Sequence, residues 1–260
     1  MPLRHVLAPR MLSLGMLAAV ALGAPAAFAV IDDNPPPPKV SAAIQKAIDS
    51  PDRAQKQKDR DVGRKPGETL AFAGLKPGQK VVELASFGQY YTDIMAPVVG
   101  PKGHIWMYDL PYTDKNFGNA SRDFVAKHPN TEFAEARFDE MDWPKDVDLI
   151  TIVLYYHDLQ YNGVNTAVMD KKMFDALKPG GKLLIVDHKA DAGSGWRDSK
   201  TIHRMGVETI VQEVTAAGFK LKIDSDLLAN PTDDHHKMVF APGERGHTDQ
   251  ALFVFEKPKA

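Results

Sequence analysis

From residue 80 onward, short β-rich runs alternate with segments whose apolar residues have helical spacing. The runs at 147–154 and 182–186 are continuously apolar, which is typical of strands buried on both faces of a parallel sheet. This alternation predicts an α/β, Rossmann-like fold: a mostly parallel, seven-stranded sheet with helices on both faces. Strands are expected at 80–84, 104–108, 131–138, 147–154, 182–186, 220–226 and 251–255, and helices between them at 90–99, 114–128, 166–177 and 201–217.

Residues 1–29 have the pattern of a secretory signal peptide. Arg4 and Arg10 precede an apolar run at 12–22, and Ala27-Phe28-Ala29 matches the small-x-small cleavage pattern. The apolar run is shorter than the roughly 20 residues that a membrane-spanning helix needs. We therefore expect export, cleavage before Val30 and no membrane span in the mature chain.

The rest of the chain is expected to hold a proline-rich linker and one domain. Residues 30–39 include four consecutive prolines, which favour a stiff extended tether. Residues 40–260 suit a single domain that begins with helices, expected at 40–49, 52–62 and 68–73.

The composition excludes some functions. The formal net charge is −2, so the chain lacks the excess of basic residues that nucleic-acid binding needs. It has no cysteine, so an exported form would be held together by its core without disulfides. The sequence does not predict an oligomeric state.

Acidic residues follow three successive predicted strands, where parallel sheets bind ligands. Glu83 ends the first strand, Asp109 follows the second and Asp139 follows the third. Asp109 could accept hydrogen bonds from both hydroxyls of a ribose, and Asp139 from an adenine amino group. Between them, Gly88 would allow a close backbone approach, and a helix starting near Tyr90 would favour a carboxylate. A single loop acid more often faces water, but three at one edge favour a nucleotide-type site.

This layout resembles that of the class I S-adenosylmethionine-dependent methyltransferases. More narrowly, the chain resembles, over about residues 50–258, a bacterial family of predicted methyltransferases that carry signal peptides. The resemblance implies S-adenosylmethionine as cofactor, methyl transfer to a small molecule and a periplasmic location. It rests on Leu75-Lys76-Pro77-Gly78, Tyr90-Tyr91-Thr92-Asp93-Ile94, Tyr156-His157-Asp158, Lys178-Pro179-Gly180-Gly181, Asp187-His188-Lys189-Ala190, His203-Arg204 and Asp226-Leu227-Leu228.

The loop after the first strand departs from the pattern of that family. Ala85, Phe87 and Gln89 stand where a typical member has glycine, and only Gly88 remains. Each extra side chain would lie where backbone touches the methionine part of the cofactor. Export also separates the protein from the cytoplasm, where S-adenosylmethionine is made. Two other functions therefore stay open: an exported protein that reuses the fold to bind a small molecule or metal or to catalyse another reaction, and a non-catalytic envelope protein.

Two histidine–acid pairs follow the fourth and fifth strands. His157 with Asp158, and His188 with Asp187, are the candidate catalytic residues. An imidazole titrates near neutral pH, so His157 could act as the general base, with Asp158 orienting it. The alternative is that His157 is a hydrogen-bonded residue of the cleft wall.

Three further residues are expected near the substrate. Tyr156 and His203 would contact it, and Arg204 could hold a carboxylate or phosphate, although a surface ion pair is the commoner role of such an arginine. Imidazole and carboxylate together also suit zinc, iron or manganese. The sequence contains no local ligand motif, so no metal ligand is assigned.

Overall fold

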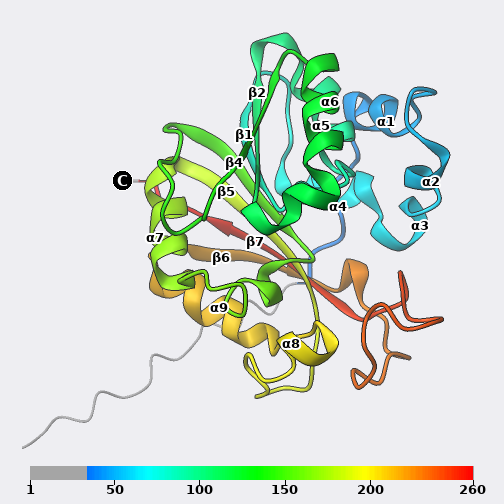
Figure 1. Ribbon diagram of the computed structural model, residues 1–260, viewed down its shortest axis with the longest axis vertical. Coiled ribbons are helices and arrows are strands. Elements are labelled where there is room, and N and C mark those ends of the chain that lie inside the picture. Colours follow the sequence, from blue (N-terminus) through cyan, green and yellow to red (C-terminus); the bar gives the residue numbers. More distant parts are fainter. Residues whose placement is uncertain (1–33, 260) are drawn as a thin grey trace, which may run out of the picture. The chain divides into compact units, whose positions relative to one another are not determined.

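The computed structural model describes residues 34–259, which fold around one seven-stranded sheet (Figure 1). The predicted signal peptide, residues 1–29, lies outside the described residues, as do residues 30–33 of the predicted linker. The strand order is β3-β2-β1-β4-β5-β7-β6, and β7 alone runs antiparallel to its neighbours β5 and β6. The predicted fold class is confirmed. The strands are β1 Lys80–Leu84, β2 His104–Asp109, β3 Thr131–Glu135, β4 Val147–Val153, β5 Leu177–His188, β6 Lys220–Ser225 and β7 Gln250–Glu256.

Helices cover both faces of the sheet because successive strand residues point to opposite sides and both sides are apolar. On one face, Val81, Ile105 and Leu184 pack against α1, α4 and α5. On the other, Val82 and Ile150 pack with α7 and α9. The larger helices are α1 Ala42–Ile48, α4 Pro66–Ala73, α5 Thr92–Val99, α6 Asn119–Lys127, α7 Thr166–Ala176 and α9 Val207–Ala216; the one-turn helices are α2 Gln55–Lys58, α3 Asp61–Arg64 and α8 Ser199–Ile202.

Two helices expected to be continuous are broken. The predicted helix at 52–62 is the pair α2 and α3, and the predicted helix at 201–217 is the pair α8 and α9. His203 has φ 56° and ends α8 in the left-handed region. Met205 then pairs with Lys189 beside the sheet. A buried ion pair of Arg204, described below, explains the second break.

Two regions far apart in the sequence lie over the carboxyl ends of the strands. One is the α2–α3 region, and the other is the irregular segment 229–249, which precedes β7 (Figure 1). Strand order changes direction between β1 and β4, and open α/β sheets bind ligands at such a point.

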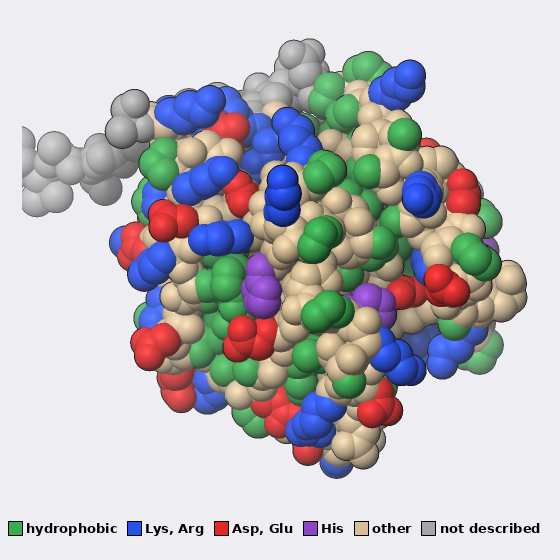
Figure 2. Space-filling view, turned by 90° about the horizontal axis from the view of Figure 1, so that it is seen from above, with side chains coloured by type: hydrophobic (Ala, Val, Ile, Leu, Met, Phe, Trp, Pro, Cys, Tyr) green, Lys and Arg blue, Asp and Glu red, His purple; other side chains and the backbone are tan. Residues whose placement is uncertain are grey.

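The surface carries charges of both signs. Figure 2 shows acidic and basic side chains interspersed over the face seen from above, with histidine side chains among them. In the described part of the chain, no helix combines the length and the apolar composition that crossing a bilayer requires.

Candidate functional site

A cavity of about 1120 Å³ opens at the carboxyl edge of the sheet. Its floor comes from the ends of β1, β4 and β5, including Glu83, Leu154 and His188. Its walls come from the α2–α3 region and the segment 229–249. A cavity of this size can hold a nucleoside cofactor together with a small substrate.

The backbone of the loop after β1 has positive φ angles, which favour glycine, at three positions, although only one of them is a glycine. Gly88 has φ 81°, but Ala85 and Gln89 also have positive φ, 56° and 49°. This conformation favours glycine, because Cβ of other residues crowds the carbonyl oxygen. The loop therefore keeps the path that the resemblance implies, although Ala85 and Gln89 stand where that family has glycine.

Glu83, the residue before the last one of β1, is almost fully buried. Burial is the largest cause of its shift and raises its pKa to about 8, a donated hydrogen bond from Thr92 lowers it, and the charge of Asp109 raises it further. At neutral pH the carboxyl group is therefore largely protonated until a cationic group approaches it.

Asp109 and Asp139 each keep one buried carboxylate oxygen without a hydrogen-bond partner among the described residues. Asp109 Oδ1 accepts from Ser86 Oγ at 3.0 Å and from the Phe87 backbone N–H at 3.1 Å, while Oδ2 has no partner. Asp139 Oδ1 is also unpartnered; its Oδ2 is 3.0 Å from Arg137. Unpaired buried acceptors are costly, and both would be satisfied by donors such as ribose hydroxyls and an adenine amino group. These acceptors fit the nucleoside part of S-adenosylmethionine.

Access to Asp109 is narrow. Neither Asp109 nor Asp139 lines the main cavity. The Phe87 ring lies between Phe117 and Tyr155, with ring centroids 5.2 and 5.5 Å away. Asp109 is fully buried and accepts from the Phe87 backbone N–H, so binding at its free oxygen requires a local rearrangement of the loop that carries Phe87.

His157 is bridged by carboxylates on both ring nitrogens. Nδ1 lies 2.6 Å from Asp187 Oδ1, and Nε2 lies 3.1 Å from Asp158 Oδ1. Burial alone would lower the pKa of His157, but the charge of Asp187 and hydrogen bonds to Asp158 and Asp187 raise it to about 10. His203 Nδ1 contacts the same Asp158 oxygen at 2.8 Å. An imidazolium with both nitrogens engaged cannot accept another proton, so this geometry does not support His157 as the general base.

His188, unlike His157, is neutral and keeps one ring nitrogen free to accept a proton. Its Nδ1 lies 2.8 Å from Thr248 Oγ1, and its Nε2 makes no hydrogen bond to the described residues. Burial, followed by the positive charges of His157 and Arg204, holds its pKa well below the ordinary value. His188 is therefore neutral and lines the cavity, with Nε2 available as an acceptor when Nδ1 donates to Thr248.

The predicted catalytic residues thus form one connected group. Both oxygens of the fully buried Asp187 carboxylate also accept backbone N–H groups, those of His157 and His188 at 2.7 and 2.8 Å. Ligand atoms of His157, Asp158 and His203 lie within 4.8 Å of one another, close enough to share a cation. The hydrogen bonds already present between them are an equally complete explanation of the cluster.

Tyr156 and Arg204 point elsewhere, contrary to the predicted substrate contacts. The Tyr156 hydroxyl is buried 2.9 Å from Asp170 and 3.0 Å from Glu213, between α7 and α9. Arg204 is fully buried and forms a two-pronged ion pair with Asp233, at 2.7 and 3.1 Å. A buried guanidinium needs such a partner, and this one ties the segment 229–249 to the strand edge. His203 does not line the cavity but reaches it through Asp158.

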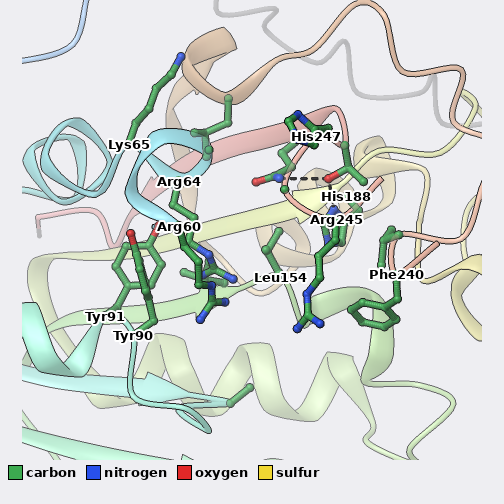
Figure 3. Close-up of a pocket in the computed structure, with 18 of the residues that line it drawn as sticks. Arg60, Arg64, Lys65, Tyr90, Tyr91, Leu154, His188, Phe240, Arg245 and His247 are labelled. Atoms are coloured by element: carbon green, nitrogen blue, oxygen red, sulfur yellow. Dashed lines mark hydrogen bonds between the residues drawn. The ribbon is translucent and has the colours of Figure 1, made fainter. Parts of the chain in front are cut away.

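Sequence patterns missed the basic residues of the cavity. Arg60 lies in the mostly charged helix expected at 52–62, Arg64 follows just after it, and Arg245 and His247 come from a segment without periodic pattern (Figure 3). The Tyr90 ring lines the cavity beneath Arg60 and Arg64, while its hydroxyl donates to Asp61 at 2.6 Å. The only local sequence feature that could have drawn attention to Arg245 is the pair of glycines around it, in Gly243-Glu244-Arg245-Gly246.

The curated proteins that this chain resembles are methyltransferases. No family model matches the chain. The ubiquinone/menaquinone biosynthesis C-methyltransferase UbiE of Vibrio vulnificus is 30% identical over 123 residues, which cover 46% of this chain and 45% of that protein. The protein of the same name from Vibrio campbellii is 28% identical over 70% of this chain and 64% of its own length. The chain thus spans about half to two thirds of these curated relatives.

Solved structures share the fold at low identity. A SAM-dependent methyltransferase from Aquifex aeolicus has a TM-score of 0.55 and 16% identity, covering 78% of this chain and 96% of that one. The [4+2]-cyclase SpnF has a TM-score of 0.55 and 14% identity, covering 82% and 85%. The chain therefore has the fold of the class I S-adenosylmethionine-dependent methyltransferases and is related in sequence to methyltransferases.

Proposed function

We propose that this protein is an S-adenosylmethionine-dependent methyltransferase that acts on a small molecule. The observation that carries the proposal is the pair of unpartnered buried oxygens on Asp109, the last residue of β2, and Asp139, in the loop after β3. The glycine-type backbone of the loop after β1 and the similarity to curated methyltransferases support it.

Each of the acidic residues near the strand ends would bind a different part of the cofactor. Asp109 would accept from the ribose and Asp139 from the adenine, while Glu83 would hold the cationic amino group. A positive amino group beside Glu83 would favour the ionised carboxylate. When bound, the cofactor supplies an electrophilic methyl group on a sulfonium sulfur.

The chain's own contribution to catalysis is alignment and proton removal. His188 Nε2 would accept the proton that the acceptor loses as the new bond to the methyl carbon forms. Asp187 holds both histidines by their backbone N–H groups, and His157 with Asp158 fixes the cavity wall next to it. His157 and Asp158 are therefore positioning residues in this proposal.

A labelling experiment tests the proposal and the role of His188. The purified protein is incubated with methyl-tritiated S-adenosylmethionine and the small-molecule fraction of a cell extract. We expect tritium in a small product, and a fall of about 100-fold in its rate of formation for His188→Ala, with cofactor affinity unchanged. A variant that transfers label as fast as the wild type would contradict the assignment of His188 as base.

We also propose that the protein is exported to the periplasm, on the strength of the signal pattern in residues 1–29. Amino-terminal sequencing of protein recovered from cells should begin at Val30. Cytoplasmic protein with an intact amino terminus would contradict this.

A second candidate function is a reaction other than methyl transfer on the same fold. The full burial of Asp109, outside the lining of the cavity, favours it, and the cyclase SpnF supports the idea that the fold serves other reactions. Failure of the protein to bind S-adenosylmethionine would favour this candidate, as would elemental analysis that finds a metal in the wild type and not in His203→Ala.

A further inference from the structure

Three arginines converge on the cavity without an acidic partner among the described residues. Arg60 and Arg64 enter from the α2–α3 region, and Arg245 enters from the segment 229–249 (Figure 3). Figure 3 shows their guanidinium groups on two sides of one space, with Leu154 between them. Within the described chain, no carboxylate lies within ion-pair distance of any of the three.

Of the nearby acids, Asp59 lies exposed at the edge of the cavity, where it accepts from Gln55, and the others are engaged or protonated. Asp61 is bound by Arg53 at 2.8 Å and by the Tyr90 hydroxyl. Asp158 is bound by two histidines. Glu83 is largely protonated at neutral pH, because burial raises its pKa to about 8. The cavity is therefore positively charged on the side of the arginines.

The fold holds these like charges together. The Arg60 and Arg64 guanidinium carbons stack over the Tyr90 ring, 5.0 and 4.7 Å from its centroid, a contact that favours cations over an aromatic face. Burial, followed by repulsion from Arg64 and Arg245, lowers the pKa of Arg60 to about 10. Their proximity costs free energy, and an anion between them would recover it.

A glycine contact brings the two segments together. Gly63 lies between Arg60 and Arg64, and Gly246 follows Arg245. A Cβ added at Gly63 would lie only 2.8 Å from the Gly246 carbonyl oxygen. The two backbones meet at a distance that only glycine permits at position 63, so Arg245 is placed opposite Arg60 and Arg64 by the packing of the fold.

We propose that Arg60, Arg64 and Arg245 bind an oxyanion, a carboxylate or phosphate, carried by the methyl acceptor. Guanidinium groups suit both anions because they donate in pairs to two oxygens. The assignment to an acceptor rests on the proposed function: S-adenosylmethionine carries a net positive charge, so an anionic acceptor would balance the cavity in the ternary complex. The alternative source of the oxyanion is the methionine carboxylate of the cofactor itself.

Inorganic phosphate is the probe for the anion site. The purified protein is titrated with phosphate at constant ionic strength and followed by calorimetry and by the melting temperature. We expect saturable binding, weakened at least about tenfold when R60Q and R64Q are combined and also in R245Q. Arg197→Gln is the matched control, since Arg197 is an exposed arginine paired with Asp198, and it should bind phosphate as the wild type does. Absence of saturable binding by the wild type, or equal binding by R60Q/R64Q and wild type, would overturn the proposal.

Two further measurements test whether the spacing of the two segments matters and which molecule carries the oxyanion. Gly63→Ala keeps all three arginines but pushes the two segments apart. It should therefore weaken phosphate binding, while its circular dichroism spectrum stays that of the wild type.

The affinity for S-adenosylmethionine is then measured with and without saturating phosphate. Unchanged affinity supports an acceptor site, whereas competition shows that the arginines hold the cofactor carboxylate and overturns the proposal. Phosphate binding without S-adenosylmethionine binding would support the anion site and reject the proposed function.

Discussion

At the scale of single residues, several positions in and around the site depart from ordinary backbone geometry. Ala85, Gln89 and Leu154 have positive φ at the ends of β1 and β4, and His203 does so at the end of α8. Such conformations cost of order 1–3 kcal/mol each and persist where the surrounding structure holds them. The sequence predicted the position of the loop after β1, but not that alanine and glutamine would adopt the backbone of the missing glycines.

Replacing Ala85 with glycine tests this strain. Ala85→Gly should raise the free energy of unfolding by about 1 kcal/mol, because glycine adopts φ 56° without crowding. Urea denaturation measures the change. The same substitution in the exposed turn of α6, Ala120→Gly, should lower stability by about 1 kcal/mol. A loss of stability in both Ala85→Gly and Ala120→Gly would contradict backbone strain at Ala85.

At the scale of elements, a fully buried ion pair helps to hold the segment 229–249. Arg204 binds Asp233 with both guanidinium nitrogens and also donates to the backbone carbonyl of Lys237 at 2.8 Å. Asp233 additionally accepts the Asp249 backbone N–H, 2.6 Å away. This ion pair positions the segment that carries Arg245 and Thr248 at the cavity. Arg204 therefore shapes the cavity although it does not line it.

Removing the arginine should release the segment. Arg204→Met leaves a buried carboxylate unpaired, which we expect to lower stability by about 3–5 kcal/mol. Hydrogen exchange should rise in residues 229–249 before the strands lose protection. Arg197→Met, which removes an exposed arginine, should change stability by less than about 1 kcal/mol. Equal exchange in Arg204→Met and wild type would show that other contacts hold the segment.

Strands were predictable and the cavity walls were not, for a physical reason. The ends of β1 and β4 fall within one residue of the prediction, because both strands are largely apolar, buried runs. The acids and histidines at the strand ends were found because parallel topology gathers them at one edge. Arg60 and Arg245 meet only through tertiary packing at Gly63, and no local pattern encodes such a meeting.

At the scale of the whole molecule, buried carboxyl groups at the site tie stability to pH. Glu83 has an ordinary pKa of 4.5 and a folded-state pKa of about 8, so the folded protein holds this proton more tightly than the unfolded chain does. Its contribution to stability is complete below pH 4.5 and is lost as pH rises through 8, with a slope of at most about 1.4 kcal/mol per pH unit.

Glu83→Gln removes this titration. The stability of the variant relative to the wild type should therefore increase between pH 4.5 and 8, as measured by urea denaturation at a series of pH values. The exposed Glu132→Gln should follow the wild type over the same range. A difference between Glu83→Gln and wild type that is independent of pH would contradict the assigned protonation.

The central claim is that the strand-end acids form a cofactor site, and calorimetry with S-adenosylmethionine tests it most directly. Saturable binding by the wild type is expected. Asp109→Asn should weaken it at least about tenfold, while the surface variant Asp175→Asn leaves it unchanged. Burial raises the pKa of Asp109 to about 6 although three hydrogen bonds lower it, so affinity should also fall as pH drops through that value. No binding by the wild type, or equal binding by Asp109→Asn and wild type, would contradict the account.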